Sequence, residues 1–138
     1  MKAIFPSAEW LQALHKKLNA DEKYARIARN WEGDLCFVIE SDETLKETNV
    51  FYLDLWHGKC RDAYVMSEGS ECKAAFILNA PYTSWVRILK GKLHPLQALA
   101  TQRLKVRGNY AYLMRQVPTV LDFTRCAQEV TRKMGRVE

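Results

Sequence analysis

Residues 91–109 have the sequence GKLHPLQALATQRLKVRGN, and this stretch carries the local signals that decide the fold. Gly91 can supply the left-handed residue that ends a helix. Pro95 suits the first position of the next helix, where its missing N–H costs nothing. Within 103–107, two apolar residues alternate with three cations, which is the period of a half-buried strand. Gly108-Asn109 then turns the chain, and the asparagine can cap a further helix.

Upstream of this stretch, apolar runs separated by polar turns predict four more strands. These strands are expected at 35–39, 50–56, 61–66 and 74–78, with a hairpin turn at His57-Gly58-Lys59. A period near 3.6 predicts the remaining helices at 7–19, 21–31, 82–89, 110–116 and about 119–134. Runs of strands flanked by runs of helices indicate an α+β fold, in which helices cover one face of a mainly antiparallel, five-stranded sheet.

The order of these elements and the residues between them resemble the sterol carrier protein 2 (SCP-2) family. That family has an apolar helix, a pattern close to G-K-L-x-P, a small-residue helix and then L-K-V-x-G-N. The matching residues here are Gly91, Lys92, Leu93, Pro95, Ala98, Leu104, Lys105, Val106, Gly108 and Asn109, preceded by Ala74–Leu78 and Tyr82–Trp85. The resemblance covers roughly residues 21–130. Family members often have glycine two residues before the Leu-Lys pair, where this chain has Gln102.

The resemblance implies an SCP-2-like fold that encloses an apolar cavity between the sheet and the later helices. Periodicity alone cannot separate a filled core from such a cavity, so the ligand-binding residues are expected from the resemblance and from the apolar content of the second half. They are Phe76, Leu78, Trp85, Leu89, Leu96, Leu99, Leu104, Val106, Leu113, Met114, Val117, Leu121 and Phe123.

Length and composition bound the remaining possibilities. A chain of 138 residues is expected to form one domain, residues 1–138. No apolar run approaches the ~20 residues that span a bilayer, and the N-terminus has no long apolar segment, so we expect a cytoplasmic protein. A formal net charge of +5 allows an acidic partner. The cations around 87–107 suit transient contact with an anionic membrane, but no aromatic residues interleave with them, so no nucleic acid is expected.

The chemically reactive side chains do not form a recognisable catalytic or metal-binding pattern. Cys36, Cys60, Cys72 and Cys126 are widely spaced, and we expect reduced, inert thiols rather than disulfides. His57 and Cys60 lack the further ligands that zinc needs, so neither a metal nor any other cofactor is expected. The sequence therefore predicts a non-enzymatic protein, monomeric or homodimeric.

The sequence and the resemblance together predict a protein that binds and carries a lipid or similar hydrophobic molecule, of the sterol, fatty acyl or phospholipid class. Arg87, Lys105 and Arg107 are candidates to hold a head group at the mouth of the cavity. One alternative is an accessory protein of an enzyme complex, with a closed core. Another is a small hydrolase or thiol enzyme, which a Cys-His pair beside the cavity would favour.

Overall fold

The computed structural model describes residues 5–67 and 70–134. Two short helices come first, α1 (Ala8–Ala20) and α2 (Glu22–Ile27). The Ser7 hydroxyl accepts a hydrogen bond from the backbone N–H of Trp10 at 3.0 Å, and the Asp21 carboxylate accepts one from that of Tyr24 at 2.8 Å. Side-chain caps of this kind satisfy N–H groups that have no partner inside a helix, so both starts follow from the sequence.

The second helix ends earlier than the apolar period of 21–31 predicts. Trp31 lies beyond α2, and its indole N–H donates to the carbonyl of Gly33 at 2.8 Å. The side chain is nevertheless buried. The buried Trp31 continues the apolar period of the helix although it lies in a loop. The period therefore predicted a helix one turn too long.

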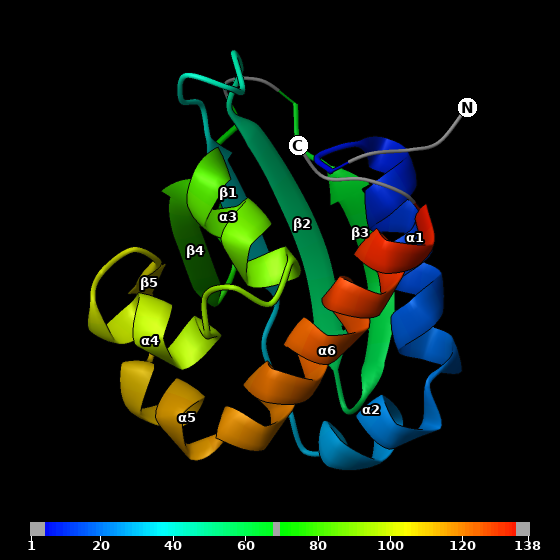
Figure 1. The fold of residues 1–138 in the computed structure, drawn as a ribbon. Helices are drawn as coiled ribbons and strands as arrows, with labels where there is room; N and C mark the ends of the chain where they lie inside the picture. Colours follow the sequence, from blue (N-terminus) through cyan, green and yellow to red (C-terminus); the bar gives the residue numbers. More distant parts are fainter. Residues whose placement is uncertain (1–4, 68–69, 135–138) are drawn as a thin grey trace.

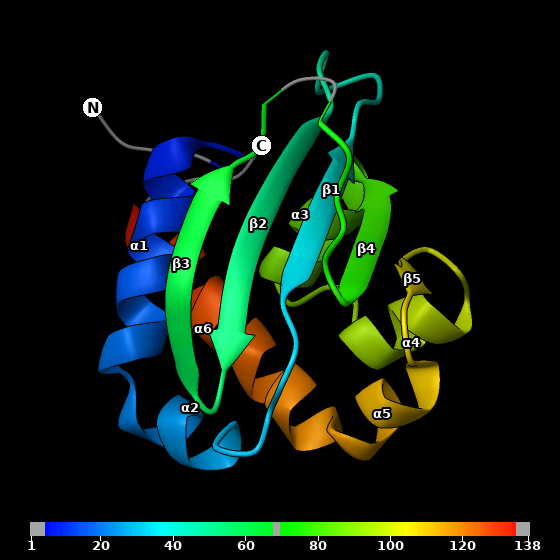
Figure 2. The same ribbon diagram turned by 180° about the vertical axis from the view of Figure 1, so that it is seen from behind.

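Five strands form one sheet with the order β3-β2-β1-β4-β5 (Figures 1 and 2). They are β1 (Leu35–Glu40), β2 (Asn49–Trp56), β3 (Lys59–Val65), β4 (Phe76–Pro81) and β5 (Lys105–Arg107). The β1–β4 pair is parallel and the other three pairs are antiparallel. The expected mainly antiparallel, five-stranded α+β fold is confirmed.

Local turn chemistry sets the β2–β3 hairpin. His57 and Gly58 form its two-residue loop with φ of 50° and 81°. Positive φ at both positions matches the twist of the flanking strands and favours glycine. A Cβ at Gly58 would lie 2.6 Å from the backbone oxygen of Ala25, so the hairpin tip also packs closely on α2.

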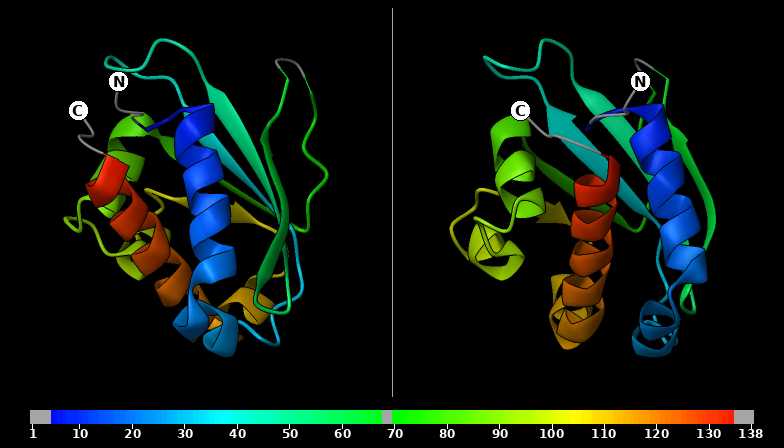
Figure 3. Two further views of the ribbon diagram at one scale, coloured as in Figure 1. Left: turned by 90° about the vertical axis from the view of Figure 1, so that its right-hand side faces the viewer. Right: turned by 45° about the vertical axis from the view of Figure 1, so that its right-hand side comes forward.

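The helices gather on one face of the sheet (Figure 3). The later helices are α3 (Tyr82–Leu89), α4 (Pro95–Ala100), α5 (Tyr110–Arg115) and α6 (Val117–Met134). β4 runs to Pro81 and leads directly into α3, whereas we expected the strand at 74–78. α6 includes Pro118 in its first turn, where the missing N–H leaves no hydrogen bond unmade.

Among the described residues, no helix has the length and apolar character needed to cross a membrane.

Residues 70–75, which lead into β4, run across the opposite face of the sheet (Figure 2). A disulfide between Cys36 of β1 and Cys72 of this segment holds it there, with the two Cα atoms 6.4 Å apart. The expectation of four reduced thiols was therefore wrong for this pair. Cys60 and Cys126 remain free and buried, and burial raises the pKa of both thiols to about 12.

A candidate ligand cavity

A cavity of about 90 Å³ lies between the sheet and the helices that cover it. Its wall from the later half of the chain consists of Leu78, Trp85, Ile88, Leu89, Pro95, Leu99, Leu104, Leu113, Thr119, Val120, Phe123, Thr124 and Ala127. Its wall from the first half consists of Phe5, Trp10, Tyr24, Trp31, Leu35, Phe37, Ile39 and Leu55. No charged side chain is among these lining residues.

The structure brings together about half of the site residues that the sequence analysis named. Those that line the cavity are Leu78, Trp85, Leu89, Leu99, Leu104, Leu113 and Phe123. They come from β4, α3, α4, α5, α6 and the segment just before β5. Elements up to 45 residues apart in the sequence therefore converge on one apolar space, as expected for a site built between a sheet and its helices.

The other named residues lie away from the lining. Phe76 is buried against Trp31, with ring centroids 5.4 Å apart. Leu121 is 36% exposed, although the neighbouring Val120 and Phe123 line the cavity. The remaining four are half-buried: Leu96, Val106, Met114 and Val117. An apolar period locates the inward side of an element but does not say which inward residues reach an open space.

The expected site residues did not include the part of the cavity wall that the first half of the chain contributes. Leu35, Phe37 and Ile39 line the cavity from β1. Their spacing of two is the strand period and was the available signal. The apolar run of β1 hid this alternation, because Cys36 and Val38 on the other face are also apolar.

Aromatic side chains form a continuous part of the wall. Phe37 of β1 contacts Trp85 of α3 and Phe123 of α6, with ring centroids 5.1 and 5.5 Å apart. The Trp85 indole N–H donates to the carbonyl of Val38 at 3.1 Å, so only the apolar body of this ring is left for the cavity. These tilted and edge contacts hold the aromatic rings in place. A ligand therefore does not have to order this part of the wall when it binds.

The few polar groups of the wall have partners or stay uncharged. The Thr124 hydroxyl donates to the carbonyl of Val120 at 2.8 Å, within α6. The Thr119 hydroxyl lies 3.4 Å from the carbonyl of Ile27. Burial raises the pKa of the Tyr24 phenol, which therefore stays neutral. The cavity is thus suited to an apolar group and offers no charge to a carboxylate or phosphate.

The cations that we considered for a head group do not line this cavity. Arg87, Lys105 and Arg107 are exposed, on α3 and β5. A charged head group of a ligand therefore cannot reach them from inside the apolar space. Any role for these cations belongs to the outer surface.

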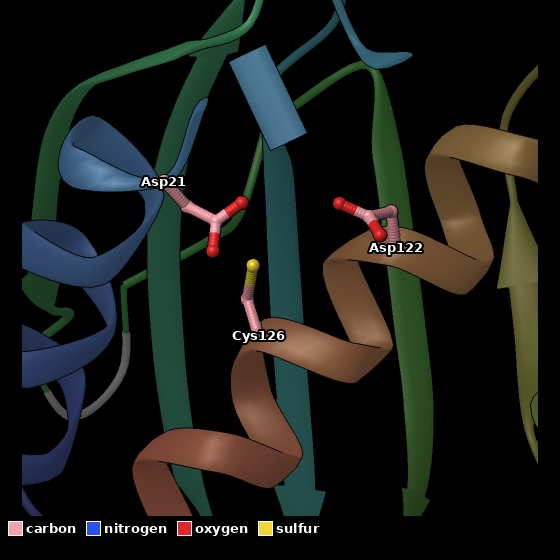
Figure 4. Close-up of side chains that lie close together, drawn as sticks. All are labelled: Asp21, Asp122 and Cys126. Atoms are coloured by element: carbon pink, nitrogen blue, oxygen red, sulfur yellow. The ribbon is translucent and has the colours of Figure 1, made fainter. Parts of the chain in front are cut away.

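A group of two carboxylates and a thiol lies between α6 and the α1–α2 junction, separate from the cavity lining (Figure 4). Ligand atoms of Asp21, Asp122 and Cys126 are within 4.8 Å of one another. Arg125 donates to Asp21 at 2.7 Å and to Asp122 at 2.9 and 3.1 Å, and Lys17 lies 3.1 Å from Asp21.

Arg125 and Lys17 determine whether the two aspartates and the thiol can bind a metal ion. Arg125 holds the pKa of the Asp21 carboxyl well below its usual range, while burial keeps the Cys126 thiol protonated. Arg125 also donates to Glu129 at 2.9 Å. A metal ion would have to displace the guanidinium from both aspartates, so we assign the group as an ion-pair network that ties α6 to the α1–α2 junction.

The chain thus has an α+β fold with an apolar cavity between its sheet and its helices, as in domains that bind small hydrophobic ligands. A comparison with protein families identifies the family. The SCP-2 sterol transfer family matches residues 10–121. The chain therefore belongs to this family, as the resemblance predicted. The matched region also takes in most of α1, which lies before the residues on which the resemblance rested. A comparison with curated protein sequences yields no match.

Solved structures show the same fold. A crystal structure of sterol carrier protein 2 is 32% identical over 89% of this chain and 96% of its own, with a TM-score of 0.81. The solution structure of a conserved hypothetical protein from Thermus thermophilus is 32% identical over 94% and 91%, with a TM-score of 0.82. A sterol carrier protein 2 from Aedes aegypti, solved with palmitate, shares the fold at 21% identity over 80% and 89%, with a TM-score of 0.52.

Proposed function

We propose that this chain binds a lipid or similar hydrophobic molecule in the cavity and carries it without making or breaking a bond. The observation that carries the proposal is the wall itself, which is apolar and has no charged side chain. Membership of the SCP-2 sterol transfer family supports the same class of ligand. Among the lining residues only Tyr24 titrates, and its raised pKa does not suit a general base at neutral pH.

The size of the cavity favours an acyl chain over a sterol. The cavity volume of about 90 Å³ lies below the roughly 300–1,000 Å³ of typical small-molecule sites, so a narrow acyl chain is accommodated more easily than a four-ring sterol. Burial of each methylene contributes about 0.8 kcal/mol. The head group would remain outside, because the wall offers it no partner.

A fluorescent fatty acid tests this proposal. We expect binding at micromolar concentration or tighter, which corresponds to about −8 kcal/mol. Leu99→Arg should weaken binding at least tenfold, because it places a charge in the apolar space. The matched control is Leu121→Arg, since Leu121 is exposed and does not line the cavity. Equal affinity in both variants and the parent protein would refute the cavity as the binding site.

The thermal midpoint of each variant separates binding from folding. Should Leu99→Arg fail to fold, Leu99→Phe offers a smaller change, which should weaken probe binding because the larger side chain occupies part of the cavity. Native mass spectrometry of protein purified from its own cells should then show a fixed mass increment from bound lipid.

The second candidate function is an accessory or interaction role with a closed core. The modest volume of the cavity is the observation that favours it. Failure of every acyl probe to bind, together with a purified protein that has the mass of the chain alone, would support this role.

A further inference from the structure

The cavity wall contains six side chains with an N–H or O–H group, and five of these groups already have an acceptor in the protein. Four of the acceptors are backbone carbonyls and one is a buried threonine hydroxyl. The five groups belong to Trp10, Trp31, Trp85, Thr119 and Thr124, with donor–acceptor distances from 2.8 to 3.4 Å. The wall therefore keeps nearly all of its hydrogen-bond donors away from the enclosed space.

Tyr24 of α2 is the exception. Its side chain lines the cavity and is completely buried. Its hydroxyl takes part in none of the hydrogen bonds within residues 5–67 and 70–134. Every side-chain nitrogen or oxygen that these residues enclose fully does have a partner. The Tyr24 hydroxyl is therefore not sealed off by packing, and it borders the open space of the cavity.

This hydroxyl lies in the enclosed part of the cavity rather than at its rim. Val120, Phe123 and Thr124 of α6 line the cavity and are partly exposed, whereas the Tyr24 side chain is not exposed at all. The ring centroids of Tyr24 and Phe123 are 6.4 Å apart. A ligand that enters beside α6 would therefore meet the phenol with its enclosed chain, while its charged head group stays in water.

The phenol of Tyr24 is a hydrogen-bond donor at neutral pH. Burial raises its pKa, and the nearby Cys60, Cys126 and Asp122 raise it further. No cationic side chain lines the cavity, so the wall offers nothing that would stabilise the phenolate. The group therefore keeps its proton and can donate its O–H to an acceptor.

Neither packing nor water accounts for a hydroxyl at this position. A phenylalanine would fill the same space, and a buried donor without an acceptor is destabilising. A buried water molecule is held by about two to four polar partners. The other donors of the wall are engaged with the protein, and the rest of the lining is apolar. An acceptor on the ligand would satisfy the Tyr24 hydroxyl.

We propose that Tyr24 is a specificity residue for an acyl ligand whose enclosed chain carries one uncharged oxygen, as a hydroxyl or keto group. The phenol donates a hydrogen bond to that oxygen. The inference rests on the proposed function and deepens it, because it names the kind of acyl chain that the same cavity takes. A chain without this oxygen also enters the cavity, but it leaves the phenol without an acceptor.

Displacement of the fluorescent fatty acid by four competitors tests the role of Tyr24. The competitors are palmitate, ω-hydroxypalmitate, stearate and a stearate hydroxylated near mid-chain. With the parent protein, at least one hydroxy acid should bind at least as tightly as its unsubstituted counterpart. Tyr24→Phe should weaken that hydroxy acid at least tenfold and change the unsubstituted acid less than twofold, since only the hydroxy acid loses a hydrogen bond. An equal effect on both acids, or on neither, would overturn the inference.

Thermal unfolding of the ligand-free protein gives a second readout. Tyr24→Phe removes a hydroxyl that has no partner in the described part of the chain, so the thermal midpoint should stay the same or rise. A fall of about 4 °C or more would show that the hydroxyl is bonded within the protein, and would overturn the inference. Tyr64→Phe is the matched control, because Tyr64 is 46% exposed and does not line the cavity. It should change neither the midpoint nor the affinity for any competitor.

Failure of the proposed function gives a different result. In that case neither the probe nor any competitor binds, and the inference about Tyr24 falls with it. Binding of all four acids to the parent protein, with no discrimination lost in Tyr24→Phe, contradicts only the inference about Tyr24.

Discussion

The Cys36–Cys72 disulfide should contribute a large share of the stability of the fold. It closes a loop with a sequence separation of 36 residues, on the face of the sheet opposite the helices. A cross-link of this length removes conformational entropy from the unfolded chain, and the chain-entropy relation gives about 3.8 kcal/mol at 25 °C. Cys72→Ser is the better perturbation, because Cys72 is only half-buried whereas Cys36 is fully buried.

Urea denaturation measures this contribution. With a slope of about 2 kcal/mol per molar urea, a loss of about 3.8 kcal/mol lowers the midpoint by about 2 M. Reduction of the parent protein with dithiothreitol should bring its midpoint to that of Cys72→Ser, and the reductant should leave the variant unchanged. Two reactive thiols, from Cys60 and Cys126, are expected in the denatured, unreduced protein. Four reactive thiols and equal midpoints under all conditions would refute the disulfide.

Gln102 is exposed with φ of 60°, a conformation that costs a non-glycine residue about 1–2 kcal/mol, so Gln102→Gly should raise the free energy of unfolding by up to about 1 kcal/mol in urea titrations. Arg125→Met should lower that free energy by about 2–3 kcal/mol, less than for a fully buried pair because the Arg125 side chain is 27% exposed. Arg125 lowers the pKa of the Asp21 carboxyl in the folded state. The stabilisation from this ion pair is therefore complete above the unfolded-state pKa of Asp21, about 4, and is lost as the pH falls below that value. The difference in thermal midpoint between the parent protein and Arg125→Met should therefore shrink between about pH 4 and pH 2, and a constant difference would contradict this account.

Residues 91–109 show why much of the fold could be predicted from the sequence. Gly91 has φ of 76°, Pro95 opens α4, and Asn109 caps α5 at 3.0 Å from the backbone N–H of Tyr112. Each of these roles depends on one residue and its immediate neighbours. Because these signals are local, the order of the elements could be predicted from the sequence.

Features that depend on topology could not be predicted in the same way. The Cys36–Cys72 bond depends on the position of β1 next to β4 in the sheet, which cysteine spacing does not reveal. The cavity wall of β1 required knowledge of which face the helices cover. Gln102 has a left-handed conformation, although its side chain gave no sign of it.

The two margins of the sheet have a consequence for self-association. Along β3, side chains of α1 occupy the outward backbone groups: Asn19 bonds both the N–H and the carbonyl of Cys60, and Gln12 donates to the carbonyl of Ala63. At the opposite margin, β5 has only three residues. Within the part of the chain that the structure describes, the bonded stretch of β3 and the short β5 therefore leave a second chain little strand with which to continue the sheet. Both margins thus disfavour fibrous growth by strand addition.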